Sequence, residues 1–123
     1  MNKTSKEDFK LFKQECKKWM KIFGLTDWEP YFLHLSKKGS DALAGCSFNV
    51  VSRGATFHLN KNWADDVVSD KEIKITAFHE VTELLLGPLN YLSRERYVAV
   101  DQIEEATHAI IRRLENVAYP KLK

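Results

Sequence analysis

Apolar residues recur at helical spacing near the start of the chain. Five of them lie three or four positions apart, at Phe9, Phe12, Cys16, Trp19 and Phe23. This spacing predicts an amphipathic helix over residues 5–23. Thr4 and Glu7 have the form of a capping box at its start, and Gly24 is typical of the residue that follows a helix.

Apolar and polar residues then alternate between residues 28 and 60, which is typical of strands. The segment WEPYFLHL, residues 28–35, places Leu33 on one side and Phe32 on the other. The segment AGCSFNVVSRGATFHLN, residues 44–60, predicts two further strands joined by a turn at residues 52–54. We expect these strands to form a small antiparallel three-stranded sheet.

Helical spacing returns in the second half of the chain. Ser69 and Glu72 form a second capping box, and the helix after it is expected to end at Gly87 and Pro88. A third helix is expected to begin at Asp101. Its apolar side carries Ile103, Thr107, Ile110, Ile111, Leu114 and Val117. The order predicts a single α+β domain over residues 1–123, with an N-terminal helix, the sheet and two C-terminal helices.

The balance of charged residues indicates which kinds of partner the protein is not expected to bind. The 123 residues include 19 basic and 17 acidic side chains, a formal net charge of +2. Nucleic acid and anionic membranes attract concentrated positive charge, so we expect neither as a partner. No secretory signal is visible, and no apolar run approaches the roughly 18 residues of a membrane span. Cys16 and Cys46 are predicted to be reduced core residues, and the protein is expected in the cytoplasm.

Candidate chemistry lies in the segment TAFHEVTELLLGPL, residues 76–89. On a helical projection most of this helix is apolar, and Thr76, His79, Glu80 and Glu83 form a narrow polar stripe. Buried ionisable groups need partners, and a divalent cation would be one. His79 and Glu83 are four positions apart, so they project side by side toward the same ion. We therefore predict that both are metal ligands.

The third helix offers a second pair of ligand types, Glu104 and His108, which are also four positions apart. A catalytic zinc takes three protein ligands and keeps one position for water. One residue of this pair would complete a site with His79 and Glu83. Glu80 would then act as general base on the water. Because glutamate neutralises part of the metal charge, manganese and iron are alternatives to zinc.

Structural roles compete with these assignments. Asp101 and Glu104 have the spacing of a capping box that needs no metal. Glu83 has two possible basic partners in the following linker, Arg94 and Arg96, with which it would form a buried ion pair.

The stretches AFHEVTELLLGPL, ERY and IEEATHAIIRRLEN resemble the small phage-encoded metallopeptidase-like proteins of the minimal zincin type. Those proteins usually read HEVxHLLL, followed by an acidic helix that ends in RRLEN. The resemblance implies a zinc-dependent hydrolase that acts on a peptide or protein in the host cytoplasm. His79 and Glu80 match the metal-binding histidine and the base, whereas Glu83 stands where the second histidine is usual. It also implies that an edge strand, here residues 55–60, pairs with an extended substrate.

Two other functions remain open. Glu105 and His108 spell ExxH, the ligand pair of di-iron bundles, but that fold needs four long helices and a second such pair. A catalytically inactive zincin-like domain that serves as a phage binding or assembly protein is the main alternative to the hydrolase.

Overall fold

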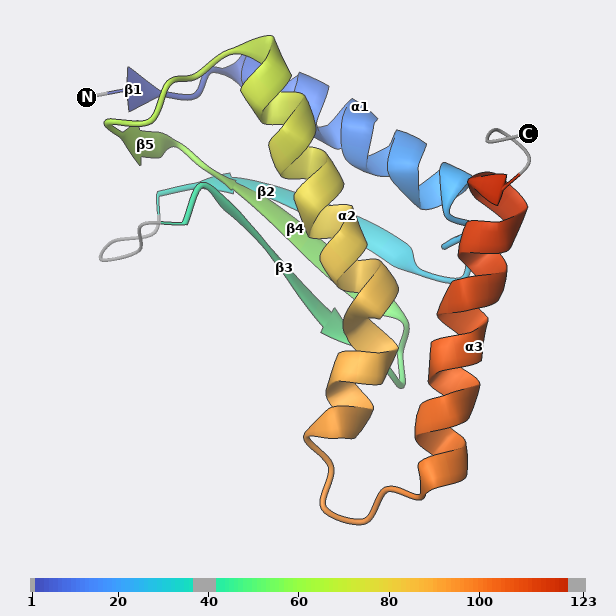
Figure 1. Ribbon diagram of the computed structural model, residues 1–123. Coiled ribbons are helices and arrows are strands. Elements are labelled where there is room, and N and C mark those ends of the chain that lie inside the picture. Colours follow the sequence, from blue (N-terminus) through green and yellow to red (C-terminus); the bar gives the residue numbers. More distant parts are fainter. Residues whose placement is uncertain (1, 37–41, 120–123) are drawn as a thin grey trace.

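The computed structural model describes residues 2–36 and 42–119 (Figure 1). Within these ranges the elements follow in the order β1 (Asn2–Lys3), α1 (Lys6–Ile22), β2 (Glu29–Leu35), β3 (Ala44–Asn49), β4 (Gly54–Asn60), β5 (Asn62–Ala64), α2 (Asp70–Ser93) and α3 (Val100–Val117). The predicted α+β class, with one N-terminal and two C-terminal helices around a small sheet, is confirmed. β1 and β5 form a separate antiparallel pair, which the alternation pattern did not predict.

The main sheet has the strand order β2-β4-β3 and is mixed. β3 and β4 form the predicted antiparallel hairpin, but β2 runs parallel to β4. The prediction of a fully antiparallel sheet is therefore wrong, because strands alternate with the same period in either direction. β4 is also the central strand, so residues 55–60 are not the expected edge strand. The two edge strands are β2 and β3.

α1 and α2 cover one face of the main sheet, and α3 lies beside the C-terminal half of α2 (Figure 1). Phe32, Phe57 and Cys46 are neighbours across β2, β4 and β3. The rings of Phe32 and Phe57 stack with their centroids 5.6 Å apart, and Phe57 is fully buried. The hydrophobic core therefore lies between this face of the sheet and the first two helices.

Ser5, one residue later than predicted, caps α1. Its hydroxyl accepts a hydrogen bond from the N–H of Asp8 at 3.1 Å, and the carboxylate of Asp8 accepts from the N–H of Ser5 at 2.8 Å. The predicted box from Thr4 and Glu7 is wrong because the Thr4 hydroxyl has another partner. It donates to the carbonyl of Asn60 at 2.9 Å. Thr4 thereby ties the start of α1 to the end of β4.

α2 continues through Gly87 and Pro88 to Ser93, so the prediction that these two residues end the helix is wrong. A proline inside a helix removes one hydrogen bond and crowds the preceding turn, and tertiary packing outweighs that cost here. Gly87 is buried against Phe48 of β3, and Pro88 lines the space between α2 and α3. A Cβ atom on Gly87 would lie 2.7 Å from Cζ of Phe48. Gly87 therefore allows the close approach of helix and strand.

Replacing Gly87 with alanine is expected to destabilise the protein by about 1–2 kcal/mol, although alanine is the better helix former. The added methyl group would overlap the ring of Phe48, which packs edge-on against Trp28 with 5.8 Å between the centroids. Urea unfolding measures this difference. Gly87→Ala combined with Phe48→Leu is the matched control, because the smaller side chain should recover part of the loss. A Gly87→Ala protein more stable than the wild type would contradict the close packing.

α3 begins before Asp101, with Ala99 as its N-cap. The N–H of Ala99 donates to the side-chain oxygen of Gln102 at 2.8 Å. The alternative capping box from Asp101 and Glu104 is therefore not formed. The residues of α3 are all exposed or half-buried. None of the described helices combines the length and the apolar character that crossing a membrane requires.

Candidate metal centre

The HEVTE segment lies on α2 where that helix crosses the sheet. Ala77 and Val81 point into the core and are fully buried. Glu80 lies at the border of this buried face and is only 3% exposed. The side chains of His79 and Glu83 are 69% and 53% exposed, because their side of α2 faces a cavity open to solvent. The predicted buried polar stripe is thus confirmed for Glu80 and wrong for His79 and Glu83, and Thr76 is half-buried.

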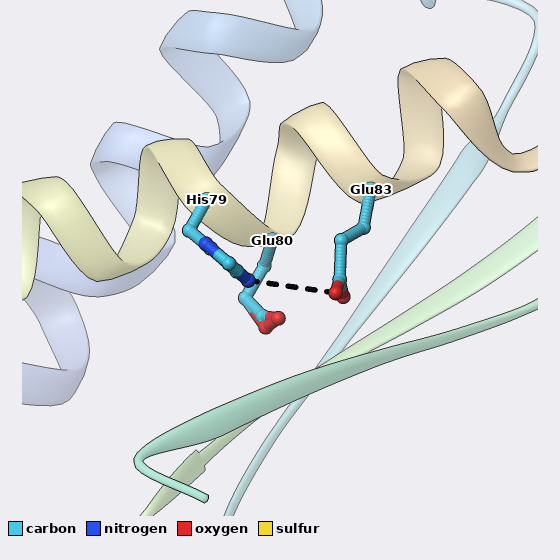
Figure 2. A group of neighbouring side chains, drawn as sticks. All are labelled: His79, Glu80 and Glu83. Atoms are coloured by element: carbon cyan, nitrogen blue, oxygen red, sulfur yellow. Dashed lines mark ion pairs between the residues drawn. The ribbon is translucent and has the colours of Figure 1, made fainter.

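The side chains of His79, Glu80 and Glu83 project from α2 toward the sheet and converge (Figure 2). Nε2 of His79 lies 3.4 Å from Oε1 of Glu83. One potential ligand atom of each residue lies within 4.8 Å of the other two, and no other group of this kind occurs among the described residues. The ion pair formed by Glu83 is with His79 rather than with Arg94 or Arg96.

The carboxyl group of Glu80 occupies an unfavourable place for a negative charge. Burial, followed by a hydrogen bond with Glu83 and the negative charge of Glu83, raises the pKa of Glu80 to about 8. Its Oε2 atom is buried and has no hydrogen-bond partner within the described residues. A buried polar atom without a partner costs about 1–3 kcal/mol. A cation beside Oε2 would offset this cost.

The three side chains border a cavity of about 700 Å³ between α2 and β3. Ala44, Gly45, Cys46 and Ser47 line it from β3. Glu72 extends the lining toward the start of α2. One of the two edge strands, β3, therefore lies directly opposite the candidate ligands.

The group has the chemistry of a divalent-cation site. Imidazole nitrogen and carboxylate oxygen are zinc ligands, and carboxylates also suit manganese and iron. Glu80 and Glu83 repel each other when both are ionised, and a cation near both would offset that repulsion. His79 and Glu83 thus offer two ligands from one helix, with a second carboxylate at their side.

The structure does not bring Glu104 or His108 to this group. Both are exposed on α3, and the side of α3 that packs toward α2 carries Ala106 and Ile110 instead. Glu105 lines a separate cavity between α2 and α3. Because α3 packs along the C-terminal half of α2 and away from β3 (Figure 1), it does not reach the cavity beside HEVTE.

The contribution of the sheet to this cavity was not predicted from the sequence. Cys46 and His58 both line it, and the thiol of Cys46 is free and half-buried. Alternation along β3 is enough to place Cys46 on the same side as the buried residues of the sheet. The periodicity of the sequence did not show that HEVTE would lie opposite that side.

Comparisons with known protein families, with curated proteins and with solved structures find no match to this chain. The resemblance to minimal zincins therefore depends on the motif stretches alone. Function has to be inferred from the geometry and chemistry of the site.

Proposed function

We propose that this protein is a metal-dependent hydrolase of the zincin-like type, in which His79 and Glu83 hold a divalent cation and Glu80 is the general base. The observation that carries the proposal is the Oε2 atom of Glu80, which is buried and without a hydrogen-bond partner within the described residues. It lies beside an imidazole–carboxylate pair that matches metal-ligand chemistry. The packing of α2 against the edge strand β3 supports a zincin-like arrangement.

The environment of Glu80 supports its role as base. A pKa of about 8 suits a carboxylate that accepts a proton near neutral pH. Zinc is the first choice of cation, with manganese and iron as alternatives, and when bound it would polarise a carbonyl group and make a water molecule more acidic. Glu80 would take the proton from that water, while His79 and Glu83 fix the position of the ion.

β3 provides the substrate-binding edge in this proposal, in place of residues 55–60. It lines the cavity, and no strand of the described ranges pairs with its outer edge. An extended peptide can add to such an edge through backbone hydrogen bonds. A peptide or protein is therefore the proposed substrate class. The free thiols of Cys16 and Cys46 support action in a reducing compartment such as the cytoplasm.

Glu80→Gln is expected to retain bound metal and to lose hydrolytic activity by about 10²–10⁴-fold, because the amide cannot accept the proton. Activity is measured on casein and on a quenched fluorescent peptide library, and bound metal by elemental analysis. Glu72→Gln is the matched control, since Glu72 lines the same cavity but does not belong to the ligand group. Equal activity of Glu80→Gln and wild type would remove Glu80 as base. Loss of metal from Glu80→Gln would make Glu80 a ligand instead.

The alternative is a catalytically inactive zincin-like domain that serves in binding or assembly. It is favoured by the contact between His79 and Glu83, which at 3.4 Å can neutralise the pair without a metal. Protein that purifies metal-free, with a melting temperature that zinc, manganese and iron(II) leave unchanged, would support this alternative.

A further inference from the structure

Cys46 faces α2 across the cavity that the candidate ligands border. It pairs in register with Phe57, whose side chain is fully buried under the helices. Since register neighbours share a face of the sheet, Cys46 lies on the helix-covered side. It lines the cavity together with His79, Glu80 and Glu83.

Electrostatics independently place Cys46 near the two carboxylates. Burial, followed by the charges of Glu80 and Glu83, raises the pKa of the Cys46 thiol to about 12. Its sulfur is outside the compact group whose ligand atoms lie within 4.8 Å of one another. Because the side chains of His79 and Glu83 are 69% and 53% exposed, they have room to turn toward β3.

The buried carboxylate provides a second observation that points to a ligand at this place. Glu80 is 3% exposed, projects from α2 toward the sheet (Figure 2), and its Oε2 atom is unpartnered in the described structure. A cation between α2 and β3 would offset the negative charge of this carboxylate, and it would lie in the cavity that the thiol also lines.

We propose that Cys46 is a third metal ligand, supplied by β3, and that the site therefore selects zinc over manganese and magnesium. This inference rests on the proposed metal-binding function of His79 and Glu83. It replaces the ligand that was expected from the third helix. With Cys46, His79 and Glu83 as ligands, Glu80 remains free to act as base, and zinc keeps one position open for water.

The chemistry of thiolate explains the selectivity. Sulfur is a soft ligand that favours zinc, whereas manganese and magnesium prefer oxygen. A thiol binds metal as thiolate, so the proton of Cys46 would leave to solvent when the ion enters. The positive charge of the cation would favour the thiolate, which burial, followed by the charges of Glu80 and Glu83, otherwise disfavours.

Cobalt(II) titration of the metal-free protein tests this ligand set, because cobalt replaces zinc and reports its donors by absorption. We expect a near-ultraviolet thiolate-to-cobalt charge-transfer band in the wild type and in Cys16→Ala, the matched control that retains Cys46. In Cys46→Ser the band should be absent while the weaker visible cobalt bands persist. Zinc affinity of Cys46→Ser should fall by at least about tenfold, and manganese affinity by much less.

The outcomes separate the two proposals. Visible cobalt bands without a thiolate band in the wild type would overturn Cys46 as ligand and leave the metal site intact. A thiolate band that persists in Cys46→Ser would also overturn it. No cobalt binding at all would refute the proposed function itself.

A second measurement needs no substitution at Cys46. In the wild-type protein, zinc should slow alkylation of Cys46 by iodoacetamide at least about tenfold, as mapped by mass spectrometry. Magnesium should have no such effect. Equal alkylation rates with and without saturating zinc would overturn the assignment even if Cys46→Ser fails to fold.

Discussion

Replacing His79 with alanine is expected to weaken zinc binding by about 100-fold or more. Loss of a residue that only hydrogen-bonds to a metal ligand already lowers metal affinity by about 10–100-fold, and loss of a ligand should cost at least as much. His79 supplies the single imidazole of the ligand group. Zinc at about 100 times its Kd would stabilise the wild type by about 2.7 kcal/mol. His79→Ala should lose nearly all of this stabilisation. Calorimetric titration gives the affinity, and thermal unfolding with and without zinc gives the stabilisation.

His108→Ala is the matched control for this experiment, because His108 is an exposed histidine on α3 that lies outside the ligand group. It should bind zinc as the wild type does. Weakened zinc binding in His108→Ala would restore the third helix as a source of ligands. Unchanged binding in His79→Ala would remove HEVTE as the metal site, because the ion would then have to lie elsewhere on the protein.

Local patterns predicted the elements of this fold better than their relative directions. The apolar spacing from Phe9 to Phe23 predicts α1 correctly, because a helix that packs on one side must repeat with its own period. The pairing partner of β2 could not be predicted in this way, since alternation along a strand does not say which strand lies beside it. β2 joins β4 rather than β3 and therefore pairs in parallel. Pro88 shows a second limit. Tertiary contacts of Gly87 and Pro88 keep the helix intact where local rules predict its end.

Only the part of the candidate site that lies on a single helix, α2, could be predicted from the sequence. The four-residue spacing of His79 and Glu83 brings their side chains together on any regular helix, and they lie 3.4 Å apart. The partner on the other side of the site depends on packing between elements distant in sequence. α3 packs against α2 through Ala106 and Ile110, so Glu104 and His108 are exposed to solvent instead of facing α2.

In the metal-free protein the free energy of unfolding is expected to fall as pH rises from about 5 to 8. Burial and the neighbouring Glu83 raise the pKa of Glu80 from 4.5 to about 8. Below pH 4.5 the carboxyl group holds its proton in both the folded and the unfolded protein. Between the two values only the folded protein retains the proton, so stability falls by up to about 1.4 kcal/mol per pH unit. Urea unfolding in the presence of a chelator, at several pH values, measures this slope.

Glu80→Gln should flatten the slope, because the amide has no proton to lose, and should be more stable than the wild type at pH 8 by roughly a few kcal/mol. Glu104→Gln, an exposed carboxylate on α3, is the matched control and should keep the wild-type slope. The other titratable groups that lie near Glu80 or line its cavity are Glu72, His79 and Glu83 on α2, Cys46 on β3, His58 on β4 and Cys16 on α1. All of them are present in both Glu80→Gln and the wild type.

The stabilisation of the folded protein by zinc should have the opposite pH dependence to the stability of the metal-free protein. The positive charge of bound zinc favours the ionised form of the nearby Glu80, so zinc binding promotes loss of the Glu80 proton. The stabilisation by zinc should therefore grow as pH rises through the range in which the metal-free protein weakens. A site closed only by the ion pair of His79 with Glu83 would show no such growth, since zinc would not exchange for the proton of Glu80. Parallel slopes with and without zinc would therefore indicate that Glu80 and the metal do not share one site.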